Sequence, residues 1–196
     1  MVPGMRTAFK EWAIVVDELG RGEQILILRK GGLEEGREGF RLEHHEFLLF
    51  PTLFHQQRES VRAAAQSRFD QLLPQLPPPE LIRLEFYAEV VQSRRLESLS
   101  AAEALRGQHC WRDDVIAKRF NWGGEPNIFA VALRVHQLTR PVELPMSPVY
   151  AGCKSWVELE QDISTADAVP VLGQQAFDHR LSQFLTALNP AAPPVC

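Results

Sequence analysis

Hydrophobic residues in the first fifty positions group into short apolar runs that glycine-rich or charged segments separate. The runs Phe9–Val16 and Gln24–Leu28 flank a Gly20-Arg21-Gly22 turn, which predicts a β-hairpin. Phe40–Phe50 resembles a further strand, and its last four residues are continuously apolar, as in a strand that is buried on both faces. These runs predict a small N-terminal antiparallel sheet.

Helical periodicity replaces this pattern from Leu53 to Leu73, where apolar residues recur on one face. Pro74 and the Pro77-Pro78-Pro79 triplet then end the helix, because proline lacks an amide hydrogen and clashes with the preceding turn. A proline cluster is also a stiff spacer. We therefore expect a sheet-and-helix unit over residues 1–78 and a second unit over residues 79–196, which can still pack together as one domain.

The second half combines strand patterns with short helical ones. A clean alternation of apolar and polar residues predicts a half-buried strand from Ile82 to Val90, and the apolar run Ile128–Val135 predicts a central strand. Ser100 and Glu103 have the spacing of a capping box at a helix start. The remaining expected elements are a helix over Asp113–Phe120, a strand over Ser155–Leu159 and a C-terminal amphipathic helix over Phe177–Leu188.

Composition narrows the function classes. With 45% hydrophobic residues among 196, the chain can bury a core, and a net charge of -4 argues against bulk attraction to nucleic acid. Any nucleic-acid contact must therefore use a local patch. The three cysteines form no C-x-x-C pair, and neither a secretory signal pattern nor a membrane-spanning apolar run is present, so we expect a cytoplasmic protein without a membrane partner.

Acidic and imidazole side chains crowd into the third apolar run and its exit. In an extended segment His44 and Glu46 share one face, and His55 follows shortly after the strand. Imidazole and carboxylate ligands together suit a divalent ion such as Mg²⁺ or Mn²⁺. The pattern therefore offers His44, Glu46 and His55 as a metal site.

Neighbouring residues extend this metal site toward phosphoryl chemistry. Glu11 approaches it if the first strand is adjacent, and Arg29 and Lys30 can neutralise a phosphate beside the metal. Glu11, Lys30, Glu43 and Glu46 are thus the candidate catalytic residues of a metal-dependent phosphodiesterase or nuclease. The simpler alternative is that Glu43–Glu46 forms cross-strand ion pairs with nearby basic residues, without any catalytic role.

A second group of residues combines aromatic and basic side chains. Aromatic rings interleaved with arginine and lysine suit a pocket that stacks a base and contacts phosphate. Burial of the aromatic rings in the core explains the same pattern without a ligand. The candidate binding residues are Arg29, Arg119, Arg134, Tyr150, Lys154 and Trp156.

Four motifs resemble those of a prokaryotic family that is known as a domain of unknown function, DUF1802. They are Lys10-Glu11-Trp12, Leu28-Arg29-Lys30-Gly31-Gly32, Phe47-Leu48-Leu49-Phe50-Pro51-Thr52 with His55-Gln56, and Gly152-Cys153-Lys154-Ser155-Trp156. The resemblance covers nearly the whole chain and implies no activity, substrate or catalytic residue. The element order of the second half, with Leu138 and Pro141, is also similar to PUA-like barrels of the ASCH and EVE branches, which bind modified bases or RNA.

These observations together favour an α+β fold, with an N-terminal antiparallel sheet and helix and a C-terminal barrel-like sheet that carries short helices and a C-terminal helix. The leading functional hypothesis is binding or processing of nucleic acid or a nucleotide. Two alternatives stay open: the metal-dependent phosphodiesterase, and a non-catalytic scaffold that uses the helix around Arg58–Phe69 as a partner surface. The sequence leaves the oligomeric state open.

Overall fold

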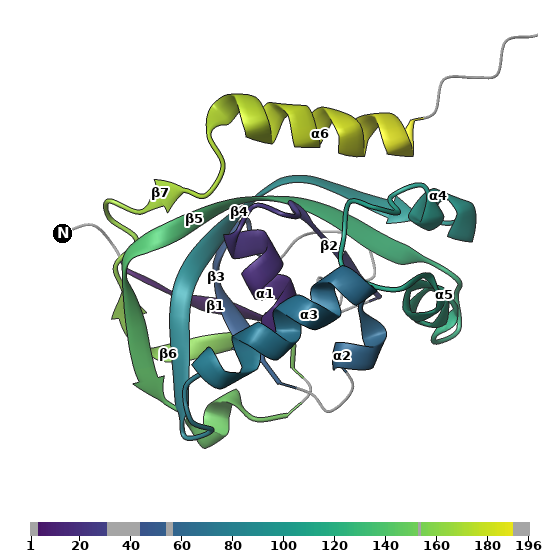
Figure 1. Ribbon diagram of the computed structural model, residues 1–196. Helices are drawn as coiled ribbons and strands as arrows, with labels where there is room; N and C mark the ends of the chain where they lie inside the picture. Colours follow the sequence, from purple (N-terminus) through teal and green to yellow (C-terminus); the bar gives the residue numbers. More distant parts are fainter. Residues whose placement is uncertain (1–3, 31–43, 54–56, 153, 190–196) are drawn as a thin grey trace, which may run out of the picture.

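Seven strands form one open sheet in the computed structural model, which describes residues 4–30, 44–53, 57–152 and 154–189. The strand order is β2-β5-β4-β3-β1-β6, and β7 pairs with β5 beside this path (Figure 1). The strands are β1 (Met5–Trp12), β2 (Leu26–Arg29), β3 (Glu46–Thr52), β4 (Leu81–Leu96), β5 (Ile128–Pro145), β6 (Trp156–Ile163) and β7 (Val169–Pro170).

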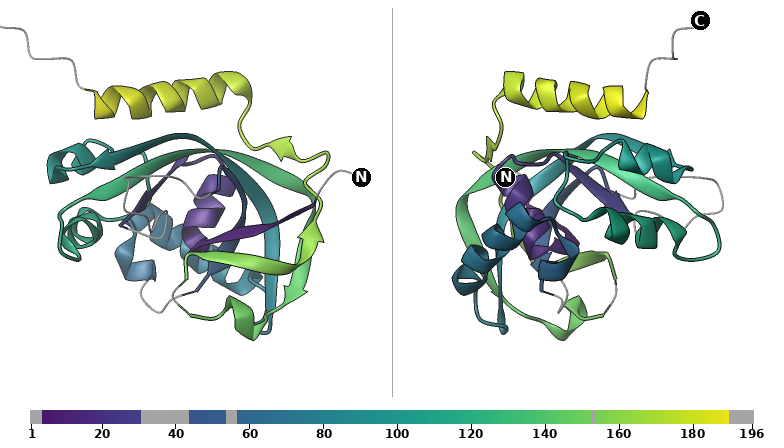
Figure 2. Two further views of the ribbon diagram at one scale, coloured as in Figure 1. Left: turned by 180° about the vertical axis from the view of Figure 1, so that it is seen from behind. Right: turned by 45° about the vertical axis from the view of Figure 1, so that its right-hand side comes forward.

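Helices lie on both faces of this sheet, which confirms the predicted α+β class. The long strands β4 and β5 arch over α1 and α3, and α6 lies across the outside of the arch (Figures 1 and 2). The helices are α1 (Ala13–Gly20), α2 (Gln57–Ser60), α3 (Ala63–Leu72), α4 (Leu99–Glu103), α5 (Asp113–Asn121) and α6 (Gln174–Leu188), with the 3₁₀ turns η1 (Leu73–Gln75) and η2 (Pro148–Tyr150). None of these described helices combines the length and apolar character of a membrane span.

The strand predicted over Ile128–Val135 is part of β5, which has a neighbouring strand on each side. β5 pairs antiparallel with β2 on one side and with β4 on the other, over a ladder that extends from Leu81 opposite Pro145 to Leu96 opposite Ile128. Because Ile128–Val135 contacts neighbours on both edges and on both faces, its almost continuous apolar sequence is explained. Strands from before and after residue 78 share this sheet, since β3 pairs with β4.

The predicted hairpin over Phe9–Val16 and Gln24–Leu28 is wrong. β1 ends at Trp12, and the following β-branched residues form helix α1. The helix buries Val15, Val16 and Leu19, which recur at helical spacing, so tertiary burial overrides their strand propensity. β1 then pairs parallel with β3 and antiparallel with β6, while β2 pairs with β5, so the N-terminal strands are not uniformly antiparallel.

Two further local predictions change in the structure. The helix expected over residues 53–73 is interrupted at Val61, which forms a β-bridge with Trp111 and separates α2 from α3. The cap of α4 is Ser98, whose hydroxyl accepts a hydrogen bond from the Ala101 amide, so the capping box expected at Ser100 is wrong. The predicted helix end before Pro74 is confirmed, because α3 ends at Leu72.

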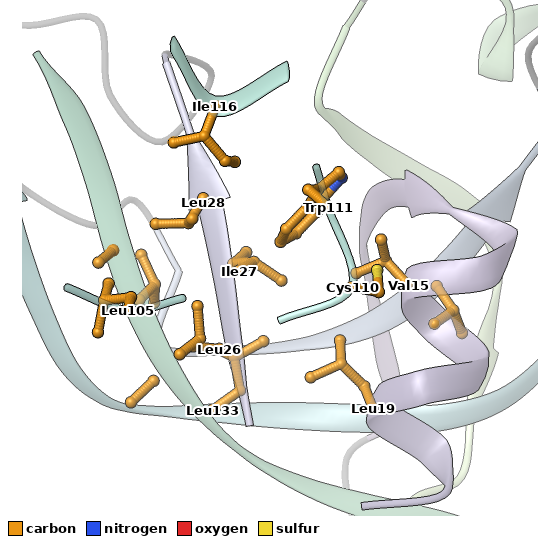
Figure 3. Close-up of a cluster of buried hydrophobic side chains, with 14 of the residues drawn as sticks. Val15, Leu19, Leu26, Ile27, Leu28, Leu105, Cys110, Trp111, Ile116 and Leu133 are labelled. Carbon is orange, nitrogen blue, oxygen red and sulfur yellow. The ribbon is translucent and has the colours of Figure 1, made fainter. Parts of the chain in front are cut away.

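The larger apolar core surrounds β2. Figure 3 shows Leu26, Ile27 and Leu28 in the middle of this core, with Cys110, Trp111 and the α1 residues Val15 and Leu19 on one side and Leu105 on the other. Trp111 lies in this core with an exposed fraction of 0%. A second apolar cluster fills the opposite end of the sheet, around Leu48 and Leu159. Trp12 at the end of β1 and Leu28 near the end of β2 pack in the larger cluster, beside the charged residues Glu11 and Arg29.

Candidate functional site

Arg119 is the most unusual charged residue of the described structure. Helix α5 places it between Ile116 and Phe120, which point into the core. Its guanidinium lies 4.6 Å from the ring centroid of Trp12 and 4.9 Å from that of Trp111, and Nη1 donates a hydrogen bond of 3.1 Å to the Leu28 carbonyl. Burial lowers the pKa of Arg119 to about 10, so the group stays charged at neutral pH.

Glu11 and Arg29 form an ion pair beside Arg119. The Glu11 carboxylate, whose residue is 1% exposed, accepts a 2.8 Å hydrogen bond from the Trp12 amide and lies 3.4 Å from Arg29 Nη1. Arg29 also donates a 2.9 Å hydrogen bond from Nη2 to Ser155 Oγ. Its side chain is 20% exposed, so this guanidinium connects the buried carboxylate with the surface.

We refer to these residues as the arginine–tryptophan cluster. Four elements assemble it: the end of β1, the end of β2, helix α5 with the segment before it, and the residue that precedes β6. Its members are Glu11, Trp12, Arg29, Trp111, Arg119 and Ser155. Within the described ranges, two guanidinium groups face a single carboxylate here, so these described residues carry an excess positive charge that attracts anions.

Trp156 joins the cluster through Phe9. The centroid of the Trp156 ring lies 4.7 Å from the ring centroid of Phe9, 4.9 Å from that of His44 and 5.1 Å from that of Phe47. All three contacts are edge-on. The guanidinium carbon of Arg29 lies 4.8 Å from the centroid of the same Phe9 ring. The structure therefore brings together Glu11, Arg29, Arg119 and Trp156, which the sequence had assigned to two separate groups.

Three buried polar atoms near the cluster have no hydrogen-bond partner in the described part of the chain. They are Trp111 Nε1, Trp156 Nε1 and Gln57 Oε1. The amide orientation of Gln57 is fixed because its Nε2 donates 2.6 Å to the Thr52 carbonyl, which can only accept. Thr52 is the register partner of Trp12 across the parallel pair β1–β3. Each unpaired buried atom costs about 1–3 kcal/mol in the folded protein.

Lys30, a candidate catalytic residue, lies away from this cluster. Its ammonium donates to the carbonyls of Phe120 and Asn127 at 3.0 Å each and also contacts the Glu125 carbonyl. Burial lowers its pKa, and the positive charge of Arg95 acts in the same direction. Lys30 therefore binds the end of α5 and the loop that follows it, as a cation at a helix C-terminus does.

Three predicted binding residues also lie elsewhere. Arg134 stacks on Phe177 of α6 at 4.4 Å, and Tyr150 is buried with its hydroxyl accepting a hydrogen bond from the Glu160 amide. Lys154 is exposed. No contact among the described residues links these three side chains to the arginine–tryptophan cluster.

Two residues of the predicted metal site, His44 and Glu46, lie in the described part of the chain. His44 contacts Trp156, whereas Glu46 is exposed in register with Glu89. Glu43 and His55 lie outside the described residues. Within the described ranges, no group of three or more histidine, cysteine, aspartate or glutamate side chains is placed to hold a metal ion. Mg²⁺ or Mn²⁺ binding stays a prediction.

Sequence reasoning missed Trp12 and Gln57 as parts of the site. Trp12 stands where a strand passes directly into a helix, and the mistaken hairpin placed it inside a strand. Gln57 lay within the helix expected over residues 53–73 and was assigned no role, although it is 1% exposed. The signal that could have found Trp12 is the Glu11-Trp12 pair, a carboxylate and an indole at the end of a buried strand.

Comparison with known proteins gives a family and a fold likeness. Among solved structures, the chain is similar to the crystal structure of ASCH from Zymomonas mobilis, with a TM-score of 0.45 and 9% identity over 90% of this chain and 93% of that one. A mutant of the same ASCH protein matches with a TM-score of 0.42 and 11% identity over 90% and 96%. No curated protein matches the chain significantly. The model of the domain of unknown function DUF1802 matches residues 8–183, and the chain therefore belongs to that family.

Proposed function

We propose that the protein binds a nucleotide, free or within single-stranded nucleic acid, at the arginine–tryptophan cluster. The observation that carries this proposal is the placement of Arg119 between two indole rings beside a second arginine, with one carboxylate among the described residues for the two guanidinium groups. A buried excess of positive charge is costly in the free protein. An anionic ligand relieves that cost.

Phosphate is the anion that this geometry suits. The Arg29 guanidinium is partly exposed, and its contact with Glu11 at 3.4 Å is long for a charge-assisted hydrogen bond. A phosphate can therefore compete for its N–H groups, with the Ser155 hydroxyl as an additional donor. The contact of Arg119 with the Leu28 carbonyl uses one of five guanidinium N–H groups, which leaves donors for the same anion.

The aromatic and polar surroundings suit the base of a nucleotide. Trp12 and Trp156 are partly exposed and offer ring faces for stacking. Trp156 is the partly exposed residue among those with an unpaired polar atom, and a base edge offers acceptors for its indole N–H. Binding at these aromatic side chains does not require a basic protein overall, which fits the net charge of -4.

Fluorescence titration tests the proposal directly. AMP, CMP, GMP, UMP and an eight-nucleotide single-stranded RNA are added to the protein while tryptophan emission is followed at two salt concentrations. We expect saturable quenching that weakens with salt and at least a tenfold loss of affinity in Arg29→Gln. Arg180→Gln is the matched control, because Arg180 belongs to α6 on the outer side of the arch. Equal binding by both variants, or no binding by the wild type, contradicts the proposal.

A further inference from the structure

We infer that a cavity beneath helix α3 binds a small organic cation with an apolar body, of the class of arylalkyl primary amines. The cavity has a volume of about 170 Å³ and lies between α1, the α3–η1 segment and β4. It shares no lining residue with the arginine–tryptophan cluster. This site is therefore separate from the proposed nucleotide site.

Apolar side chains form most of the cavity wall. Val16 comes from α1, Leu72 from α3 and Phe86 from β4, and the proline-rich segment adds Leu76 and Pro77. Proline has no amide hydrogen and fixes its own backbone angle, so this wall is stiff and offers no donor at Pro77. An apolar cavity of about 150 Å³ accommodates benzene. The space therefore fits one aromatic ring with a short substituent.

The two arginines at the cavity already have counter-ions. Arg68 donates to both carboxylate oxygens of Asp17, at 2.7 and 2.6 Å. Arg83 contacts the Glu143 carboxylate through Nε at 2.9 Å and Nη2 at 2.8 Å, and its Nη1 donates to the Gln75 carbonyl at 3.1 Å. Neither guanidinium is available as a strong site for an anionic ligand.

Glu85 is the charged group at the cavity that lacks such a partner. It is half-buried, and it makes no hydrogen bond or ion pair with any residue in the described ranges. β4 changes register against β5 between Leu84 and Phe86, so the strand bends where Glu85 and Phe86 line the cavity. Asp17 is paired with Arg68 and also lies 3.8 Å from Arg21 Nη1, so Glu85 is the carboxylate of the described cavity wall that has no arginine partner.

An unpaired carboxylate at the rim of an apolar space determines the ligand chemistry. The carboxylate accepts hydrogen bonds and cannot donate them when ionised. An ammonium group supplies both the opposite charge and N–H donors, and a hydrophobic body fills the space between Val16, Leu72 and Phe86. A neutral molecule of the same shape satisfies the walls and leaves the charge unmatched.

Benzylamine and benzyl alcohol are matched probes for this inference, because they share size and shape and differ in charge. Titration at pH 7 by calorimetry should give a benzylamine Kd on the order of 1 mM, as for other ligands of this size. Benzyl alcohol should bind at least about threefold more weakly, the preference that a partly exposed ion pair supplies. Glu85→Gln should remove this preference, whereas Glu97→Gln, an exposed carboxylate near the end of the same strand, should retain it.

A second variant distinguishes this cavity from other binding places. Leu72→Trp enlarges a half-buried wall residue and should weaken both probes at least about fivefold, since it occupies the apolar space. Three results overturn the inference: equal affinity of the wild type for both probes, a preference for benzylamine that persists in Glu85→Gln, or unchanged binding in Leu72→Trp. Each variant is compared with the wild type in urea unfolding, so that loss of folding is not mistaken for loss of binding.

Discussion

The guanidinium of Arg119 lies 4.6 Å from the ring centroid of Trp12, and this contact joins the end of the first strand to helix α5. The two residues are distant in the sequence. Their contact also places a positive charge beside the Glu11–Arg29 ion pair. Arg119 therefore contributes both to the folding of this region and to the charge of the proposed nucleotide site.

We expect Arg119→Lys to lower both stability and nucleotide affinity. Lysine keeps the charge but lacks the flat guanidinium that stacks on Trp12 and Trp111, so the free energy of unfolding should fall by about 1–2 kcal/mol. Urea unfolding and AMP titration measure the two effects. Arg140→Lys, at an exposed position on β5, should change neither, and wild-type behaviour of Arg119→Lys would show that the stacking is unimportant.

Local patterns in the sequence predicted some elements and missed others for a physical reason. Helix α5 and strand β5 were predicted because their apolar residues follow a helical period or form one unbroken run. Helix α1 was missed because Ile14, Val15 and Val16 have strand propensity, and only their burial beneath β2 and β5 makes the helix favourable.

The site was predicted in its parts but not in its assembly. Arg29 and Lys30 are adjacent in sequence and were assigned to one phosphate site, yet Arg29 contacts Glu11 while Lys30 contacts the loop after α5. Successive residues at a strand end point to opposite faces, which explains the separation. The union of Arg29 with Arg119 depends on the strand order, which a single sequence does not specify.

We expect the more buried of two ion pairs with the same geometry to have the larger coupling energy. Arg68–Asp17 and Arg58–Asp70 are both bidentate, but the side chains of the first pair are 26% and 11% exposed and those of the second 47% and 49%. A double-mutant cycle with alanine, followed by urea unfolding, should give a coupling energy of about 1–2 kcal/mol for Arg68–Asp17. The exposed pair should give a clearly smaller coupling, because water and salt screen it. Equal couplings would contradict the role of burial.

We expect Gly20→Ala to destabilise the protein, although alanine is normally the better helix residue. A Cβ atom at Gly20 would lie 2.3 Å from the ring of Phe86, so the helix end or the ring must move. Overpacking of this kind costs about 1–3 kcal/mol, which exceeds the gain of about 1 kcal/mol in helix propensity. Thermal unfolding measures the difference. Gly124→Ala, where the added Cβ meets no atom within 4 Å and the backbone is not left-handed, is the control and should unfold close to the wild type.

Protonation of His109 should make the fold less stable at low pH. The residue is 3% exposed, and burial lowers its pKa to about 4, with Arg62 acting in the same direction. Because the folded-state pKa lies below the ordinary value of 6.5, the unfolded chain takes up the proton first as pH falls. The stabilisation that the neutral ring contributes above pH 6.5 is therefore lost progressively toward pH 4. His109 alone should lower the free energy of unfolding by about 2–3 kcal/mol between pH 7 and pH 4.5.

Urea unfolding of the wild type and of His109→Gln at both pH values isolates the contribution of His109, since the remaining titratable groups titrate equally in the two proteins. If the two proteins lose the same stability, His109 is not the group responsible.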